Sequence, residues 1–367
     1  MNILFLANHL DTGGITSYLL SLGKGLKDRG HRVFVASSGG NRVTRFTEQG
    51  IIFIPIPIRT KSELNLFSII PSLAILCRQV RENGIDCIHA NTRVTQVLAR
   101  LVSARTGIPF VSTCHGFFRP RFFRRRFPCL GRKVIAISDS VKGHLMDDFK
   151  VPEPAIRLVY SGVDTEGLRM EGGRSRGEVR RGFGLGDGPV IGIVARLSDV
   201  KGHIFLVRAF KSVVQKAVDA QLLIVGEGKM ENTLRRAARE LGIERNVVFV
   251  PEVNNIREAY YAIDIFVMPS LNEGLGLGLM EAMAWGKPCV GSAVGGILNL
   301  IRDGENGLLV RPGDSDGLAQ AVLRLLDSPD LCATLGNNAR LFISRNFSLE
   351  KMAEETERVY TECVLKS

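Results

Sequence analysis

The sequence predicts an α/β protein built from two doubly wound parallel sheets. Short apolar runs alternate with longer amphipathic runs along the first 160 residues, and the alternation starts again after residue 189. Continuous strands rich in Ile, Val and Phe are typical of a parallel sheet that is buried on both faces. At 367 residues the chain is long enough for two domains with separate hydrophobic cores.

The first half predicts the first of these sheets. Amphipathic spacing indicates helices at 16–30 and 67–83. Between and after them, apolar runs predict strands at 2–7, 31–37, 50–57, 85–91, 108–114 and 133–138. Glycine and charge then dominate residues 164–189, which predict a linker and a surface-exposed helical segment.

The second half repeats the pattern. Its predicted strands lie at 189–197, 220–228, 246–251, 263–270, 288–296 and 306–314, with the fourth expected to end at Pro269. Its predicted helices lie at 203–218, 230–243, 278–286 and 317–328. We therefore expect an N-terminal Rossmann-like domain over 1–165 and a C-terminal one over 166–347. The final helix, 348–367, is expected to pack back on the first domain.

Composition narrows the class of protein. No apolar run reaches the roughly 18 residues that a membrane-spanning helix needs, and the start of the chain resembles a first strand more than a signal peptide. The seven cysteines form no CxxC pair, which favours buried reduced thiols over disulfides or a metal site. We therefore expect a cytoplasmic protein.

The charge of the chain is unevenly distributed. Residues 1–160 hold 23 Lys and Arg against 10 Asp and Glu, a difference of +13, and the remaining residues hold 25 against 27, a difference of −2. This asymmetry favours a partner of opposite charge bound to the first domain.

Two acids and three glycines mark the end of the fourth strand of the second half. Glu273 and Glu281 flank a run in which Gly274, Gly276 and Gly278 alternate with leucines. At a strand-to-helix turn, backbone without side chains can present N–H groups to the oxygens of a ligand at contact distance. A carboxylate accepts hydrogen bonds from a vicinal diol, as in a ribose or hexose. A solvated loop with two acids is the simpler alternative.

Two further turns have the composition of anion sites. Gly13 and Gly14 follow the first strand and open the first helix, where free N–H groups and the helix dipole favour phosphate. Arg196 and Lys201 follow the first strand of the second half and can neutralise the charge on a departing diphosphate. A tight turn and solvent-facing charges are the respective alternatives.

Together these stretches resemble retaining glycosyltransferases of family 4, the glycosyltransferase group 1 family. The run "EGLGLGLMEAMAWGKPCV" is similar to the family's EGFGLxxLEAMAxGxPVV, and the stretches "VARLSDVKG", "LLIVGEG" and "NGLLVRPGD" are also similar to family motifs. The resemblance covers nearly the whole chain, most strongly residues 189–313. Leu275 stands where the family usually has an aromatic residue, and Gly278 where it has a branched one.

The resemblance implies a GT-B fold, in which two Rossmann-like domains face a central cleft. It also implies that His115, in "STCHGFF", lies near the sugar, although a lone histidine at a strand end is more often structural. The implied catalytic residues are His115, Arg196, Lys201 and Glu273. The implied donor-binding residues are Gly13, Gly14, Arg196, Lys201, Glu273, Gly274, Leu275, Gly276, Leu277 and Glu281.

The mechanism expected from the resemblance is front-face transfer with retention of configuration. Because Arg196, Lys201 and the helix termini can stabilise the leaving group, no divalent metal and no cofactor is expected. The only Asp-x-Asp, Asp314 and Asp316, precedes an apolar periodic run and is better explained as a helix cap than as a metal site. The donor is expected to be a nucleoside-diphosphate sugar, with UDP favoured over GDP.

A basic and aromatic segment, residues 115–133, is expected to bind the acceptor or a membrane. Phenylalanines interleaved with arginines suit an anionic membrane surface on the inner face of the cytoplasmic membrane, or an acidic acceptor glycan. No nucleic-acid motif accompanies them, so a nucleic-acid partner is not expected. The residues proposed for this patch are Phe118, Arg119, Arg121, Phe122, Arg124, Arg125 and Arg126.

The leading hypothesis is a hexosyltransferase that acts on a lipid-linked, lipopolysaccharide or other envelope glycan. A nicotinamide-dependent oxidoreductase is disfavoured, because the first turn lacks the third glycine of the dinucleotide fingerprint. A non-catalytic nucleotide- or glycan-binding protein is the remaining alternative.

Overall fold

A computed structural model describes residues 1–58, 60, 66–120, 122–165, 173–251, 253 and 255–365. It divides into two compact units, unit 1 with Met1–Gly162 and Leu349–Ser367, and unit 2 with Val163–Ser348. Arg121, predicted for the basic patch, lies outside the described residues. In the part of the chain that the structure describes, no helix is long and apolar enough to cross a membrane.

Within the described residues, unit 1 contains a seven-stranded parallel sheet in the order β3-β2-β1-β4-β5-β6-β7. Its strands are β1 Asn2–Leu6, β2 Arg32–Ser37, β3 Ile52–Pro55, β4 Cys87–Ala90, β5 Phe110–Cys114, β6 Lys133–Ala136 and β7 Ile156–Leu158. Strand β1 pairs with β2 and β4, so Ile3 lies opposite both Val33 and Cys87. The last strand, β7, was not predicted because its three residues are too short to show a period.

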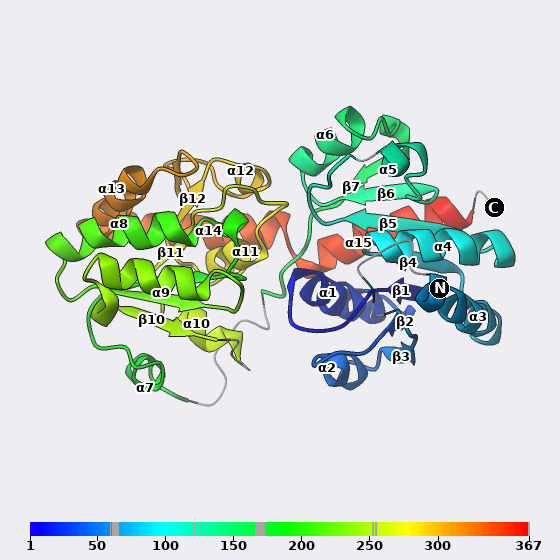
Figure 1. The fold of residues 1–367 in the computed structure, drawn as a ribbon, viewed down its shortest axis with the longest axis horizontal. Helices are drawn as coiled ribbons and strands as arrows, with labels where there is room; N and C mark the ends of the chain where they lie inside the picture. The colour runs from blue at the N-terminus through cyan, green and yellow to red at the C-terminus, as the bar shows by residue number, and fades with distance from the viewer. Residues whose placement is uncertain are drawn as a thin grey trace. The chain divides into compact units, whose positions relative to one another are not determined.

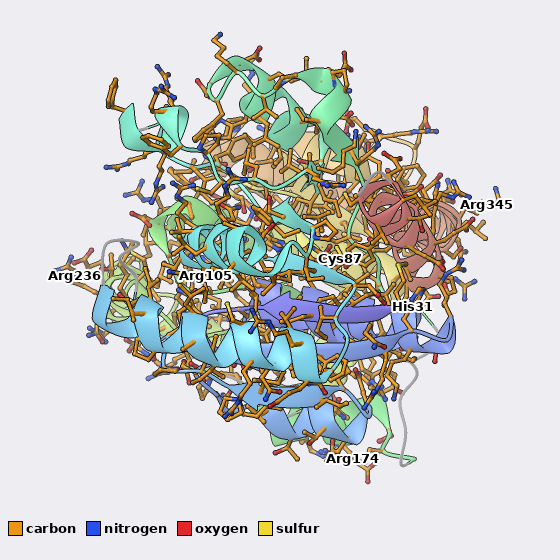
Figure 2. The ribbon with its side chains drawn as sticks, turned by 90° about the vertical axis from the view of Figure 1, so that its right-hand side faces the viewer. His31, Cys87, Arg105, Arg174, Arg236 and Arg345 are labelled. Atoms are coloured by element: carbon orange, nitrogen blue, oxygen red, sulfur yellow. The ribbon has the colours of Figure 1, made fainter. Side chains whose placement is uncertain are left out.

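Helices cover both faces of this sheet (Figure 1). They are α1 Gly14–Asp28, α2 Val43–Glu48, α3 Leu66–Glu82, α4 Arg93–Thr106, α5 Phe122–Arg126, α6 Asp139–Asp147 and α15 Leu349–Val364. One core lies between the strands and α1, α2 and α15, and a second lies between the strands and α3 and α4. In Figure 2, α3 and α4 cross in front of the strands, with Cys87 labelled at the start of β4. Successive strand residues such as Leu4 and Phe5 therefore enter different cores.

Within the described residues, unit 2 contains a six-stranded parallel sheet in the order β10-β9-β8-β11-β12-β13. Its strands are β8 Val190–Val194, β9 Gln221–Val225, β10 Val247–Val250, β11 Ile265–Met268, β12 Cys289–Ser292 and β13 Leu308–Val310. Strand β11 thus ends one residue before the predicted Pro269. This correction has a simple cause, because proline has no N–H to donate to a ladder.

The helices of unit 2 again cover two faces. They are α7 Arg176–Gly182, α8 His203–Lys216, α9 Glu231–Glu240, α10 Ile256–Ala262, α11 Leu277–Ala284, α12 Ile297–Leu300, α13 Ser315–Leu326 and α14 Pro329–Asn346. One core joins the strands to α8, α9 and α13, and α11 packs against β11, β12 and α14. Asp314 caps α13, with its Oδ1 accepting from the Gly317 amide at 2.8 Å, which confirms the predicted helix cap.

The predicted exposed helix within 164–189 is corrected in part. Helix α7 forms there, but Val179 and Arg180 on it are buried. The guanidinium of Arg180 donates to the Ala262 carbonyl, and it also binds Asp264. Because a carboxylate and a helix-end carbonyl bind its guanidinium, Arg180 can be buried, and this face of α7 need not be exposed to solvent.

Candidate active site

The carboxyl ends of β8 and β11 bring the two predicted turns of unit 2 together. The segment after β8 ends in a 3₁₀ turn, Asp199–Lys201, and Gly202 follows with φ 68°. A Cβ on Gly202 would lie 1.9 Å from the Pro269 carbonyl oxygen, so only glycine allows this approach. The Leu271 amide also donates to the Val200 carbonyl at 2.8 Å. The turn after β8 is therefore fixed against the turn after β11.

An ion pair joins these two turns. Lys201 Nζ donates to Glu273 Oε2 at 2.6 Å, and Ser270 Oγ donates to the same oxygen at 3.0 Å. The Glu273 residue is only 8% exposed, so the lysine and the serine hydroxyl together satisfy a buried carboxylate. Ser270 was not predicted, and the signal for it is its position three residues before Glu273 at the end of β11.

The glycines after Glu273 serve different physical purposes. Gly276 has φ 101° and directly precedes α11, a conformation that glycine adopts without strain. A Cβ on Gly278 would lie 2.5 Å from the Val194 carbonyl oxygen, so this glycine lets the first turn of α11 touch the end of β8. Leu275 is 1% exposed, so its side chain belongs to the core and only its backbone can contact a ligand.

A second glycine turn, after β12, supports the first. The Gly296 amide donates to the Glu273 carbonyl at 3.0 Å. A Cβ on Gly295 would lie 2.1 Å from that same oxygen, and a Cβ on Gly296 would lie 2.4 Å from the Leu275 Cα. The turn after β12 thus fixes the backbone of residues 273–275. The first-turn amides of α11 have no acceptor within the helix.

Glu281 on α11 is anchored by a tyrosine on α10. The hydroxyl of Tyr260 donates to Glu281 Oε2 at 2.5 Å, and Tyr260 is fully buried. Burial raises the pKa of Glu281, and the hydrogen bond from Tyr260 acts in the opposite direction. Tyr260 was not predicted, because it lies 21 residues from Glu281 and on a different helix.

Arg196 is placed differently from Lys201. Its side chain is exposed at the end of β8, and among the described residues it makes no hydrogen bond to Glu273 or Glu281. The structure thus brings Lys201, Glu273 and the turn 274–277 into one cluster, with Glu281 on the helix that follows. Arg196 is left with an uncommitted guanidinium in that part of the chain.

In unit 1, Gly13 and Gly14 lie where the sequence predicted, at the start of α1. Both are exposed, and Gly13 precedes the helix without a side-chain cap. A Cβ on Gly13 would meet nothing within 4 Å, so no neighbour within the structure requires glycine there. The first-turn amides of α1 are therefore unobstructed by side chains of these two residues.

His115 follows β5 and is half-buried. Its Nε2 lies 3.0 Å from Asn91 Oδ1, and its ring contacts Tyr18 edge-on at a centroid distance of 4.7 Å. Burial lowers the pKa of His115 to about 3, so the imidazole is neutral near pH 7. Neither Asn91 nor Tyr18 was predicted, and the chain order gives no signal for their proximity.

The basic and aromatic segment has both exposed and inward-facing members. Phe122 and Phe127 are 75% and 58% exposed, and Arg119, Arg125 and Arg126 are also exposed. Phe118 instead is half-buried, and its side chain and that of Arg124 line a cavity of about 20 Å³ together with Leu130, Leu145 and Phe149. The described part of the predicted patch therefore splits into an outer and an inner face.

Comparison with known proteins identifies the family of the chain. Residues 175–342 match the sequence model for glycosyl transferases group 1, and residues 12–167 match that for Glycosyltransferase Family 4. The chain is 30% identical over 356 residues to N-acetyl-alpha-D-glucosaminyl L-malate synthase of Bacillus anthracis, covering 92% of this chain and 91% of that one.

Two further proteins illustrate the range of relatives. One is the UDP-Gal:alpha-D-GlcNAc-diphosphoundecaprenol alpha-1,3-galactosyltransferase of Escherichia coli, 24% identical over 331 residues, covering 85% of this chain and 84% of that one. The other is a crystal structure of HepE from Anabaena in complex with UDP and glucose, with a TM-score of 0.86, 24% identity and coverage of 98% and 99%. This likeness in fold confirms the predicted GT-B fold.

Proposed function

The chain belongs to the group 1 glycosyltransferases of family 4, and we propose that it transfers a hexose-type sugar from a UDP-sugar to an anionic envelope glycan or glycolipid with retention of configuration. Membership in this family disfavours the oxidoreductase and the non-catalytic binding protein that the sequence left as alternatives.

The observation that supports the proposal most is the cluster around Lys201 and Glu273. A lysine ammonium has three donors, and one of them is committed to Glu273 at 2.6 Å. Two donors remain for phosphate oxygens. They lie next to the turn 274–277, whose backbone amides donate to no acceptor in the part of the chain that the structure describes. The buried Glu273 carboxylate can accept from sugar hydroxyls on the same side. The ammonium therefore suits a diphosphate, and the adjacent carboxylate suits the hydroxyls of a hexose.

Each group then has a defined role in transfer. Lys201 and Arg196 stabilise the negative charge that develops on the departing diphosphate. Glu281, fixed by Tyr260 at 2.5 Å, accepts from the two ribose hydroxyls. These cations and the backbone amides stabilise the leaving group without a divalent metal. The departing phosphate takes the proton of the attacking hydroxyl on the same face of the sugar.

The acceptor is proposed to be anionic. Two relatives have names that contain an acidic acceptor moiety, L-malate in one and a diphosphoundecaprenol-linked sugar in the other. Residues 1–160 carry the whole excess of positive charge, 23 Lys and Arg against 10 Asp and Glu. Opposite charges of this kind raise the rate of encounter and the local concentration of acceptor. The name of the second relative also supports UDP as the nucleotide of the donor.

The outer face of the basic segment is proposed to bind an anionic membrane surface on the cytoplasmic side. Its exposed phenylalanines, Phe122 and Phe127, lie among exposed arginines. Each arginine near a negatively charged surface contributes about 1 kcal/mol, and the rings insert at the level of the headgroups. Sedimentation with liposomes that contain or lack phosphatidylglycerol tests this. Equal recovery in the supernatant from both would contradict it.

The transfer reaction is tested by product analysis. We expect release of UDP that depends on a GlcNAc-diphospho-lipid or another anionic acceptor, without loss of rate in EDTA. The anomeric proton coupling of the product should match that of the donor sugar. An inverted product would reject the retaining mechanism, and restoration of the rate by added Mg²⁺ after EDTA would reject metal independence. Absence of UDP release from every UDP-sugar would reject the donor class.

A further inference from the structure

The family resemblance implies that His115 lies near the sugar, and an asparagine in unit 1, Asn91, is hydrogen-bonded to this histidine. Asn91 directly follows β4 and is 3% exposed. Its backbone amide donates to the Leu6 carbonyl at 3.2 Å, which fixes it to the neighbouring strand. Its side chain lies between the end of β4 and His115.

Two hydrogen bonds fix the orientation of the Asn91 amide. Its Nδ2 lies 3.1 Å from the backbone carbonyl oxygen of His89, which can only accept. The amide nitrogen therefore points to His89, and Oδ1 points to His115 Nε2 at 3.0 Å. An amide oxygen also only accepts, so the proton of this second bond belongs to His115 Nε2.

The charge state of His115 then determines whether its other ring nitrogen, Nδ1, carries a proton. The titratable groups that face it in unit 1 are Tyr18 on α1 and His89 on β4. Burial raises the pKa of Tyr18 to about 12 and lowers the pKa of His89 to about 3, so both are neutral near pH 7. His89 is itself held by Tyr360 at 2.7 Å and Thr113 at 2.6 Å. A neutral His115 with its proton on Nε2 has a lone pair on Nδ1.

We propose that Asn91 is a positioning residue that holds His115 in the Nε2–H tautomer, so that Nδ1 accepts a hydrogen bond from a sugar hydroxyl of the substrate. The identity of that hydroxyl's owner rests on the proposed function, whereas the tautomer does not. Among the described residues, Nδ1 has no hydrogen-bond partner. His115 thus orients the sugar as an acceptor and supplies neither a proton nor positive charge.

The tautomer is measured without any substrate. Long-range proton–nitrogen correlation spectra of the protein labelled with ¹⁵N-histidine report which ring nitrogen carries hydrogen. His115 is identified among the six histidines by the signals lost in His115→Gln. We expect protonated Nε2 and bare Nδ1 from pH 8 to pH 5. A proton on Nδ1, or titration of His115 within that range, would overturn the inference.

Two substitutions test the consequence for transfer. Asn91→Leu removes the acceptor, so the tautomer is no longer fixed, and kcat/KM for the donor should fall by about 10- to 100-fold at every pH. Asn91→Asp keeps an acceptor but adds negative charge, which raises the pKa of His115. At pH 8 this variant should lose less activity than Asn91→Leu. Its remaining activity should be lost as the pH falls, because protonation puts a hydrogen on Nδ1.

The matched control is Asn306→Asp in unit 2. Asn306 is also 3% exposed and also donates from Nδ2 to a backbone carbonyl, that of Leu300 at 3.0 Å. A new acidic limb in both Asp variants would assign the effect to a buried charge in general and reject the positioning role. If the spectrum shows the Nε2–H tautomer but neither Asn91 variant changes kcat/KM, the proposed sugar contact fails while the tautomer assignment stands.

Discussion

The ammonium of Lys201 neutralises a buried acid and is proposed to bind a phosphate at the same time. This is feasible because three hydrogens point from one nitrogen in different directions, and Glu273 uses only one of them. The arrangement also explains why Glu273 can be almost fully buried, since a carboxylate without a partner would be costly there.

Lys201→Ala should lower kcat by about 10²- to 10³-fold and change the donor KM much less. The ammonium is proposed to stabilise charge that develops only in the transition state, and loss of one such donor has that effect. Initial rates with the donor varied measure both constants. Arg236→Ala, at an exposed position on α9, is the control and should leave both unchanged. A large rise in KM with constant kcat would contradict the role.

Tyr260→Phe should make donor binding fail at a higher pH than in the unaltered protein. Burial already raises the pKa of Glu281, and the Tyr260 hydroxyl opposes that rise. Without the hydroxyl the pKa of Glu281 rises further, so the carboxylate is protonated, and loses one acceptor oxygen, earlier as the pH falls. Calorimetric titration with UDP-sugar from pH 8 to pH 5 measures the shift. Tyr261→Phe, the adjacent tyrosine, is the control, and equal curves for the two variants would reject the role.

At the scale of elements, the position of α11 depends on its contact with β8. A strand end and a helix start cannot normally approach so closely, because a Cβ would intervene. Because Gly278 has no Cβ, it can contact Val194, and this contact places Glu281 opposite Tyr260. A Cβ added to Gly278 would also lie 3.5 Å from the Tyr260 hydroxyl. The departure from the branched residue of the family thus has a packing reason.

Gly278→Ala should lower the free energy of unfolding by about 1–3 kcal/mol, as expected when a well-packed contact is overfilled. The Cβ would meet a backbone oxygen, which cannot rotate away. Urea denaturation measures the loss. Gly143→Ala in α6 is the control, because its Cβ would meet only the Asp147 carboxylate at 3.9 Å. That control should instead gain about 0.5–1 kcal/mol from the better helix former. Equal effects of the two substitutions would contradict the packing argument.

The C-terminal helix α15 contributes a polar contact to the core of unit 1. Tyr360 is fully buried, and its hydroxyl bonds to His89 Nδ1 at 2.7 Å. Tyr360→Phe should therefore destabilise the protein by about 1–3 kcal/mol, since it leaves a buried ring nitrogen unpaired. Thermal unfolding followed by circular dichroism measures the change. Thr361→Val, at an exposed position beside it, should have little effect, and a Tyr360→Phe protein as stable as the control would contradict this role of the hydroxyl.

For the whole molecule, the decisive property is the separation of charge along the chain. Residues 1–160 carry an excess of 13 positive charges, and the rest of the chain carries an excess of 2 negative ones. Attraction of an anionic acceptor by exposed arginines weakens with salt, because the screening length falls to about 3 Å at 1 M. A contact in a partly buried cluster such as that of Lys201 is screened less.

Raising NaCl from about 0.05 M to about 0.5 M should therefore increase the KM of the acceptor more than the KM of the donor. Initial rates with each substrate varied measure this difference. In a double variant, Arg125→Ala with Arg126→Ala, the salt dependence of the acceptor KM should become weaker. An unchanged dependence in that variant would show that other cations attract the acceptor.

The sequence by itself determined the fold class, the two parallel sheets and the turns that carry Lys201, Glu273 and Glu281. These features depend on local periodicity and on short spacings, which physical chemistry translates directly into strands, helices and their junctions. The same is true of the cap at Asp314, which needs only the three residues that follow it.

Only the tertiary structure decided the partners of those residues. Tyr260 meets Glu281, and Asn91 meets His115, because sheet order and helix packing bring separate segments together. Asn91 and His115 lie at the ends of the adjacent parallel strands β4 and β5, and sequence separation does not reveal that adjacency. Burial, which raises the pKa of Glu281 and lowers the pKa of His115, likewise arises only when the whole chain has packed.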